Sequence, residues 1–108
     1  MISVIISRHN DEYKNVSLEG HAGYADKGQD IVCAAVSVLV INTFNSIERF
    51  TEDAFSCEAA EDGGYMSMSF SEKLSEKSVL LLDSMLMGLE EIRKQYGDEY
   101  ISLQYKEV

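Results

Sequence analysis

The chain contains no proline and no tryptophan, and its 108 residues include no proline-rich or low-complexity tract. Without a linker of that kind, we expect a single domain spanning residues 1–108. This length is enough to bury a hydrophobic core but leaves no room for a separate regulatory module. No internal repeat is visible either, because the histidine and cysteine motif described below occurs only in the first half of the chain.

Basic residues are also scarce. Lysine and arginine number 9 against 19 aspartates and glutamates, so the formal net charge is −10. This balance argues against direct nucleic-acid binding, because phosphate backbones repel an acidic surface, and it favours a basic or neutral partner. Many unrelated soluble proteins are acidic as well, and plain solubility accounts for most of these charges.

Long hydrophobic runs are missing too. The opening run MISVIISR is too short for a signal peptide, and no later stretch reaches membrane-spanning length without a charged residue. We therefore expect a cytoplasmic protein with no membrane partner. In that reducing compartment Cys33 and Cys57 are expected to be free thiols rather than a disulfide.

Neither a metal site nor a redox motif is visible. His9 and His21 lack cysteines or carboxylates at the spacings of a structural zinc site, so we expect no metal and no cofactor. His9 is interpreted as a turn residue. Cys57 is expected to pack in the core or to be a tolerated free thiol. The absence of a C-x-x-C pair disfavours a thiol-redox protein.

The most informative segments are GHAGYA, residues 20–25, and GQDIVCAAVS, residues 28–37. They contain His21 and Cys33, and an imidazole with a thiol is the minimum equipment for nucleophilic catalysis by cysteine. Small residues surround both groups, so that another backbone can approach closely, as an extended peptide does. The small residues near the imidazole are Gly20, Ala22, Gly23, Ala25 and Gly28, and those beside the sulfur are Ala34 and Ala35.

These segments, with Thr43 and Asn45 of the following VLVINTFNSIERF, resemble the ribosomal-processing cysteine protease family of bacteria. The resemblance implies that His21 and Cys33 form the catalytic pair. It also implies the substrate, the N-terminal extension of large-subunit ribosomal protein twenty-seven, which carries apolar and aromatic residues just before the cut. Members of the family form homodimers, so the resemblance implies a homodimer here.

The apolar patterns predict an α+β fold, a two-layer sandwich in which two helices cover a mixed sheet. Polar turns are predicted at His9–Asn15 and at Glu61–Gly64, and Gly97 is predicted to stop the second helix. In chain order we expect strands at Ile2–Arg8 and Val16–His21, a buried helix from Ile31 to about Arg49, strands at Phe55–Ala59 and Tyr65–Phe70, a helix from about Ser75 to Tyr96, and a strand at Ile101–Tyr105.

Asp30 is a natural N-cap for the first helix, which places Cys33 in its first turn. The helix dipole and a protonated His21 are expected to lower the pKa of the thiol there. The Asp30 carboxylate either caps the backbone, which we favour, or orients His21. Free amides near Ile31, that of Cys33 included, are candidate oxyanion donors. Ser37, one turn later, either lines the pocket or hydrogen-bonds to the backbone of its own helix. We favour the second interpretation because serine in helices commonly makes that bond.

Two further features concern the surface. The polar segment 23–29 is interpreted as a lid over bound peptide or as an ordinary connection. The loop of Tyr24 is expected to form an apolar groove together with the Cys33 helix. The second helix is more apolar than one sheet-facing stripe requires, which indicates a subunit contact or a wide core face. Its surplus residues are Leu80, Leu81, Leu82, Met85, Leu86, Met87 and Leu89.

The patterns predict a cytoplasmic protein with a cysteine nucleophile, Cys33, and a histidine base and acid, His21. The resemblance implies that it is an endopeptidase of ribosome assembly. The rival from another class is a non-catalytic, acidic homodimer that holds a basic ribosomal protein during assembly. A small thiol-redox protein is the third reading. Loss of turnover without loss of peptide binding in a Cys33→Ala variant separates the first from the others.

Overall fold

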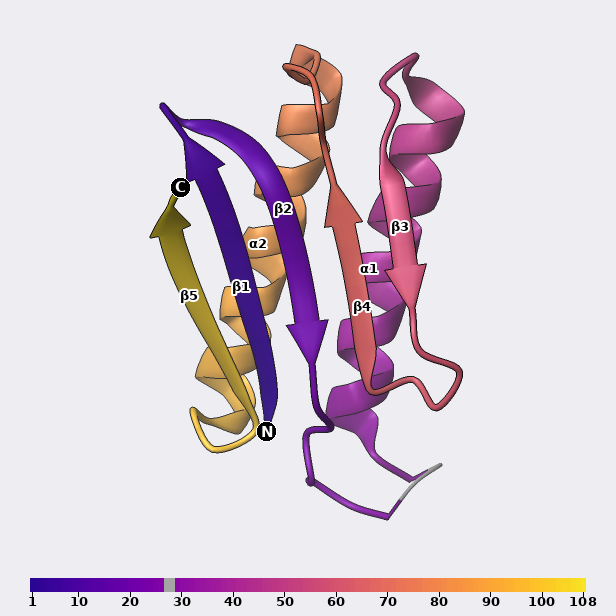
Figure 1. Cartoon of the computed structure of the whole chain (residues 1–108). Coiled ribbons are helices and arrows are strands. Elements are labelled where there is room, and N and C mark those ends of the chain that lie inside the picture. The colour runs from indigo at the N-terminus through magenta and orange to yellow at the C-terminus, as the bar shows by residue number, and fades with distance from the viewer. Residues whose placement is uncertain (27–28) are drawn as a thin grey trace.

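The computed structural model describes residues 1–26 and 29–108 (Figure 1). Its elements are β1 (Ile2–His9), β2 (Glu12–Glu19), α1 (Ile31–Phe50), β3 (Ser56–Ala59), β4 (Tyr65–Ser69), α2 (Glu76–Tyr96) and β5 (Ile101–Glu107). The strands form one sheet in the order β3-β4-β2-β1-β5, with β5 parallel to β1 and the other neighbours antiparallel. Figure 1 shows both helices on one face of this sheet. The predicted two-layer α+β sandwich is confirmed.

The hydrophobic core lies between the helices and one face of the sheet. Because successive strand residues point to opposite faces, Val4 and Ile6 of β1 are buried together with their β2 partners Leu18 and Val16. The helices add Val32, Val36, Val40, Phe44 and Ile47 from α1 and Leu82, Met85, Leu86 and Leu89 from α2. Full burial of each such side chain contributes roughly 1.5–3 kcal/mol, so this layer fixes the helices against the strands.

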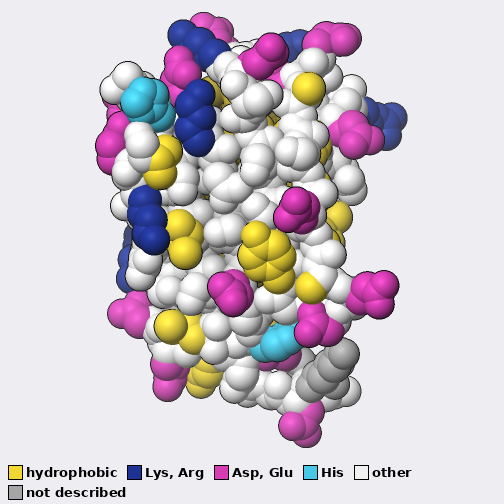
Figure 2. Space-filling view, in the orientation of Figure 1, with side chains coloured by type: hydrophobic (Ala, Val, Ile, Leu, Met, Phe, Trp, Pro, Cys, Tyr) yellow, Lys and Arg dark blue, Asp and Glu magenta, His cyan; other side chains and the backbone are white. Residues whose placement is uncertain are grey.

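The opposite face of the sheet is polar. Ser7 on β1 and Ser17 on β2 alternate with core residues, and Ser67 and Ser69 continue this face on β4. The side-chain amide of Asn15 donates hydrogen bonds to the hydroxyls of Ser67 and Ser69 at 2.9 and 2.8 Å. Figure 2 views this face and shows it mostly white, the colour of uncharged polar side chains and backbone. One side of the sheet is therefore left to solvent.

The first hairpin is tighter than predicted. A turn over His9–Asn15 was expected, whereas β2 already begins at Glu12 and only two residues separate the strands. Asn10 and Asp11 both adopt positive φ, 49° and 66°. Two such residues form the turn whose twist matches that of antiparallel strands, and Asn and Asp tolerate this conformation better than most residues. The prediction overlooked this turn and was wrong about the start of the strand.

β2 ends earlier than predicted, which changes the setting of His21. The strand stops at Glu19, and Gly20 adopts a φ of +96°, so His21 lies in the connection after the strand rather than at its end. The N–H of Gly20 leaves the ladder and donates to the carbonyl of Gly64 at 2.8 Å. A side chain at position 20 would overlap the carbonyl oxygen of Met1. Glycine is therefore required where the chain turns away from the sheet.

The helices differ from expectation in how much apolar surface they bury. α1 was predicted to be a buried helix because its first half is apolar almost all round, yet Ile31, Val38 and Ile41 are 51%, 70% and 45% exposed. This helix is long and apolar enough to cross a membrane by length and composition, a test that core helices of soluble proteins also pass. On α2 most of the surplus belongs to the core, while Leu80 and Met87 remain exposed. The wide core face thus explains most of that surplus.

The segment after α1 also caps α2. Asp53 accepts hydrogen bonds from the backbone N–H and hydroxyl of Ser75, the N-cap of α2, and from the hydroxyl of the fully buried Ser78. The hydrogen bonds from Ser75, followed by that from Ser78, hold the pKa of Asp53 below its ordinary value of 3.8. This cluster fixes the start of α2 against the end of α1.

Candidate active site

A cavity of about 540 Å³ opens at the end of the sheet where β2 ends, α1 begins and the β3–β4 turn folds back. This volume is within the range of ordinary ligand sites. His21 and Cys33 both line it, although β2 and α1 approach it from different layers of the fold. The other lining residues are Ile2, Leu18, Gly20, Gly23, Ala25, Asp30, Ala34, Val36, Ser37, Val40, Asp62, Gly63 and Met66.

Asp30 fixes the start of α1 and the approach of the chain to it. Its Oδ1 accepts hydrogen bonds from the N–H groups of Val32 and Cys33, both at 3.0 Å, and its Oδ2 accepts one from the N–H of Tyr24, also at 3.0 Å. Partial burial acts to raise the pKa of this carboxyl, but backbone donors from Cys33, Tyr24 and Ala25 outweigh burial and lower it. The predicted N-cap is confirmed. Both carboxylate oxygens bind backbone rather than the imidazole of His21.

The capping by Asp30 changes two expectations about the helix start. The amides of Val32 and Cys33 were candidate oxyanion donors, but both already donate to Oδ1 of Asp30. The thiol pKa was expected to be lowered, whereas partial burial, followed by the charge of Asp30, raises the pKa of Cys33. Burial of the sulfur and the negative charge of Asp30 therefore outweigh the favourable effect expected from the helix dipole.

The sulfur of Cys33 is held toward the His21 segment. The N–H of Ala22, a residue that is only 3% exposed, donates a hydrogen bond to Sγ at 3.2 Å. This bond favours the thiolate, against the larger effect of burial. His21 itself is exposed at the mouth of the cavity. Ala22 is therefore buried in the protein, while its neighbour His21 is exposed and lines the cavity.

Tyr24 packs away from the predicted groove. Its ring makes edge-to-face contacts with Tyr96 and Tyr100, at centroid distances of 5.6 and 5.2 Å. Within residues 1–26 and 29–108, the cavity walls include Gly20 and Gly23 but not Tyr24. The loop of Tyr24 was expected to form part of an apolar groove, and its residues Gly23 and Ala25 line the cavity while the tyrosine ring does not. Instead it attaches the loop to the end of α2, where two other aromatic rings are available.

Of the remaining residues singled out in the sequence, some line the cavity and others lie elsewhere in the fold. Ser37 is exposed and lines the cavity, as the pocket interpretation expected. Gly28 lies outside the residues that the structure describes, so the lid interpretation of 23–29 stays a prediction. Thr43 is buried and donates from its hydroxyl to the Leu39 carbonyl at 2.8 Å, which is a helix contact. Cys57 is a free thiol exposed on β3, so core packing was the wrong alternative for it.

Sequence reasoning missed the contribution of the β3–β4 turn. Asp62 and Gly63 line the cavity, and Met66 adds an apolar side chain. Glu61–Gly64 was recognised as a hairpin turn, but its partner was unknown. β4 pairs with β2 so that Tyr65 lies opposite Glu19. This pairing places the β3–β4 turn next to the segment that contains His21. Ile2 and Leu18 also line the cavity from strands that were predicted for their core role alone.

No metal site emerges within the described parts of the chain. Across residues 1–26 and 29–108, no group of three or more His, Cys, Asp or Glu side chains is arranged to hold a metal ion. The reactive groups present in the cavity are a thiol, an imidazole and two carboxylates. A cysteine and a histidine in a peptide-sized cavity define a candidate site for a cysteine hydrolase.

Comparison with known proteins agrees with this class. Residues 1–102 match the family model Peptidase_Prp, described as cysteine protease Prp. The ribosomal processing cysteine protease Prp of Bacillus subtilis is 34% identical over 103 residues, which cover 91% of this chain and 92% of the relative. The protein of the same name from Staphylococcus aureus is 33% identical over 108 residues, 98% of this chain and 100% of the relative. The chain belongs to the cysteine protease Prp family, which confirms the resemblance and the enzyme class.

Solved structures give the same fold. A crystal structure of the Staphylococcus aureus protease with a covalently linked product peptide superposes with a TM-score of 0.91 at 31% identity and covers 98% of this chain and 100% of that one. A second structure of that protease, with a substrate peptide, gives a TM-score of 0.84 at 30% identity and the same coverage. A Streptococcus mutans protein gives 0.86 at 33% identity and covers 100% of this chain and 96% of that one.

Proposed function

We propose that this chain is a single-domain, cytoplasmic endopeptidase that removes the N-terminal extension of large-subunit ribosomal protein twenty-seven during ribosome assembly. The observation that carries the proposal is that His21 and Cys33 line one cavity large enough for a peptide segment. The names of the relatives, ribosomal processing cysteine proteases, support the substrate class. The two Staphylococcus aureus structures, described with a substrate peptide and with a covalently linked product peptide, support peptide cleavage.

In the proposed mechanism, Cys33 starts as a neutral thiol, because burial and Asp30 raise its pKa. His21 takes the thiol proton as Sγ attacks the peptide carbonyl carbon, and the carbonyl oxygen becomes an oxyanion. His21 then gives that proton to the amide nitrogen, the C–N bond breaks, and a thioester remains on Cys33. Water, deprotonated by His21, attacks the thioester and releases the acid, and the proton returns to the sulfur.

The chemistry of the cavity supports the proposed substrate. Its walls combine apolar side chains from strands and from α1, among them Leu18, Val36 and Met66, with the thiol at their edge. Apolar or aromatic residues before the cut would lose contact with water there, at roughly 25 cal/mol per Å² buried. The net charge of −10 would attract a basic ribosomal protein and disfavours nucleic acid as a direct partner.

We further propose that the protein is a homodimer without a membrane partner. Ile31, Val38 and Ile41 leave apolar surface on α1, and Leu80 and Met87 leave more on α2. Exposed apolar surface of this kind is typical of an interface between subunits. Sedimentation equilibrium of the wild type and of a Val38→Glu variant checks this part of the proposal. A monomer at all protein concentrations in the wild type would contradict it.

Cleavage of a defined peptide tests the enzymatic proposal. Wild-type protein and its Cys33→Ala variant are incubated with a peptide that spans the extended N-terminus of ribosomal protein twenty-seven, and the products are read by mass spectrometry. We expect one cut after the apolar and aromatic run with the wild type, and none with the variant. Equal peptide binding by both proteins with no cleavage by either would favour the assembly-factor reading and make Cys33 a packing residue.

A further inference from the structure

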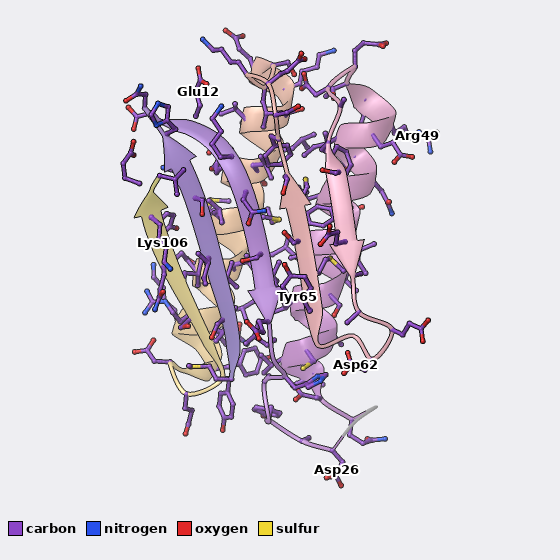
Figure 3. The ribbon with its side chains drawn as sticks, in the orientation of Figure 1. Glu12, Asp26, Arg49, Asp62, Tyr65 and Lys106 are labelled. Carbon is purple, nitrogen blue, oxygen red and sulfur yellow. The ribbon has the colours of Figure 1, made fainter. Side chains whose placement is uncertain are left out.

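The carboxylate of Asp62 lies near the imidazole of His21 although the two residues are 41 positions apart in the sequence. The two side chains meet across Gly64: a Cβ placed on Gly64 would be 3.2 Å from Oδ1 of Asp62 and 3.3 Å from Nε2 of His21. Since one point is that close to both atoms, Oδ1 and Nε2 are separated by no more than about 6.5 Å. Figure 3 shows Asp62 on the turn that joins β3 to β4, at the end of the sheet where β2 leads toward α1.

This arrangement is held by the backbone. The N–H of Gly64 donates to Oδ1 of Asp62 at 2.8 Å, which fixes the carboxylate over the turn. The carbonyl of the same Gly64 accepts from the N–H of Gly20 at 2.8 Å, which fixes the turn against the segment of His21. The turn is thus tied to the histidine segment at the residue that separates the two side chains.

Asp30, the other carboxylate that lines the cavity among the described residues, is occupied elsewhere. Its oxygens accept from the N–H groups of Tyr24, Val32 and Cys33, and its charge acts on the thiol. Asp62 and His21 are both exposed. Because their Oδ1 and Nε2 are no more than about 6.5 Å apart, the carboxylate charge acts on the imidazole across that distance. The two acidic residues of the cavity therefore act on different groups. Asp30 acts on the thiol of Cys33, and Asp62 lies near the imidazole of His21.

We propose that Asp62 is a positioning residue for His21, whose negative charge holds the imidazole at the cavity and stabilises it when it carries the thiol proton. This inference rests on the proposed function, because it assigns Asp62 a part in the proton transfer between Cys33 and His21. A negative charge beside the imidazole favours its protonated form. Asp62 therefore lowers the energy of the thiolate–imidazolium state, which the raised pKa of Cys33 otherwise disfavours.

The test uses the alkylation of Cys33 by iodoacetamide, which needs no peptide substrate. All proteins carry Cys57→Ser, so that Cys33 is the one thiol measured. We expect Asp62→Asn to slow alkylation at neutral pH by roughly 3- to 10-fold and Asp62→Glu to restore most of the rate. Glu61→Gln is the matched control, because it removes the same charge from the adjacent turn residue, and it should change the rate less than twofold. An unchanged or faster rate in Asp62→Asn would overturn the proposal.

A second pair of variants separates positioning from simple support of the fold. In a His21→Ala background, Asp62→Asn should have no further effect on alkylation, because its action passes through the imidazole. Gly64→Ala keeps both side chains but places a methyl group between them, at a position without positive φ, and should slow alkylation as Asp62→Asn does. Equal slowing by Asp62→Asn with and without His21 would assign Asp62 to the structure of the turn and refute the positioning role.

Peptide cleavage completes the test and distinguishes two failures. With an active wild type, Asp62→Asn should lower kcat by roughly 3- to 10-fold and leave KM within a factor of two, because the effect falls on proton transfer rather than on binding. Wild-type kcat in this variant would overturn the inference and leave the proposed function intact. If the wild type cleaves no peptide, the proposed function fails, and the alkylation rates still decide whether Asp62 acts on His21.

Discussion

The backbone N–H of Ala22 donates a hydrogen bond to the sulfur of Cys33 at 3.2 Å. This contact joins the segment after β2 to the first turn of α1, and it does so next to His21 rather than through it. The thiol is therefore placed by a buried backbone group, while the neighbouring imidazole stays accessible from the cavity. Because a backbone N–H holds the sulfur, the imidazole of His21 is not needed to hold it and can accept or donate a proton.

Replacing Cys33 should abolish catalysis without loss of substrate binding. Cys33→Ala and Cys33→Ser are expected to lower kcat by at least about 10³-fold, because neither side chain forms a thiolate at neutral pH. Peptide affinity, measured by fluorescence anisotropy, should stay within a few-fold, since the apolar walls are unchanged. Residual turnover above one tenth of the wild-type rate would exclude Cys33 as the nucleophile.

Neutralising Asp30 should make the thiol more reactive. Asp30→Asn removes the negative charge that helps to raise the pKa of Cys33 but keeps an oxygen able to cap α1. The thiolate fraction at pH 7 should therefore increase, and alkylation of Cys33 should become several-fold faster. Thermal denaturation is the control, since asparagine caps a helix about as well as aspartate does. A slower alkylation rate at unchanged Tm would contradict the direction of the effect assigned to Asp30.

Local signals in the sequence predicted the start of α1 well. Asp30 and Cys33 are three residues apart, and an N-cap is decided within a single helical turn. The pKa of the thiol was predicted in the wrong direction because it depends on burial and on which way the Asp30 carboxylate points. Neither quantity is contained in the spacing of the two residues.

Gly20 should be far less tolerant of substitution than Gly23. Both have positive φ, +96° and +72°, so alanine is strained at either position. A Cβ at position 20 would also collide with the carbonyl of Met1, whereas nothing lies within 4 Å at position 23. We expect Gly20→Ala to destabilise the fold by about 2–4 kcal/mol and Gly23→Ala by about 1 kcal/mol, measured by urea denaturation. Equal losses would show that the contact with Met1 is unimportant.

Asp53 should stabilise the fold in a pH-dependent way. Its pKa is lowered in the folded state by hydrogen bonds from Ser75 and Ser78, so its contribution is complete above the ordinary value of 3.8 and disappears as pH falls through the lower, folded value. Asp53→Ala should cost about 1–2 kcal/mol at pH 7 through loss of these bonds at the start of α2. The difference from wild type in urea denaturation should shrink below about pH 4. A difference that stays constant from pH 7 to pH 3 would contradict this account.

The position of Asp62 shows why part of the site could not be predicted. Glu61–Gly64 contains enough information to predict a turn, because glycine and acidic residues favour turns locally. Where that turn lies depends on the pairing of Tyr65 with Glu19, which is decided by strand register over a long separation. His21 and Cys33 can be recognised as candidate site residues by their residue types. Nothing comparable in the sequence indicates that the β3–β4 turn with Asp62 also lines the cavity.

The parallel pairing of β5 with β1 has a consequence for folding during translation. β1 is the first strand of the sheet to be synthesised and β5 is the last, and Ile2 lies opposite Ile101 in their register. Ile2 also forms a wall of the cavity, and β1, which pairs with β2 early in the chain, gains its second neighbour β5 only after nearly the whole fold has been translated. Contacts between such distant segments form late and slowly. The strand that carries this wall is therefore paired on both sides only after translation of β5.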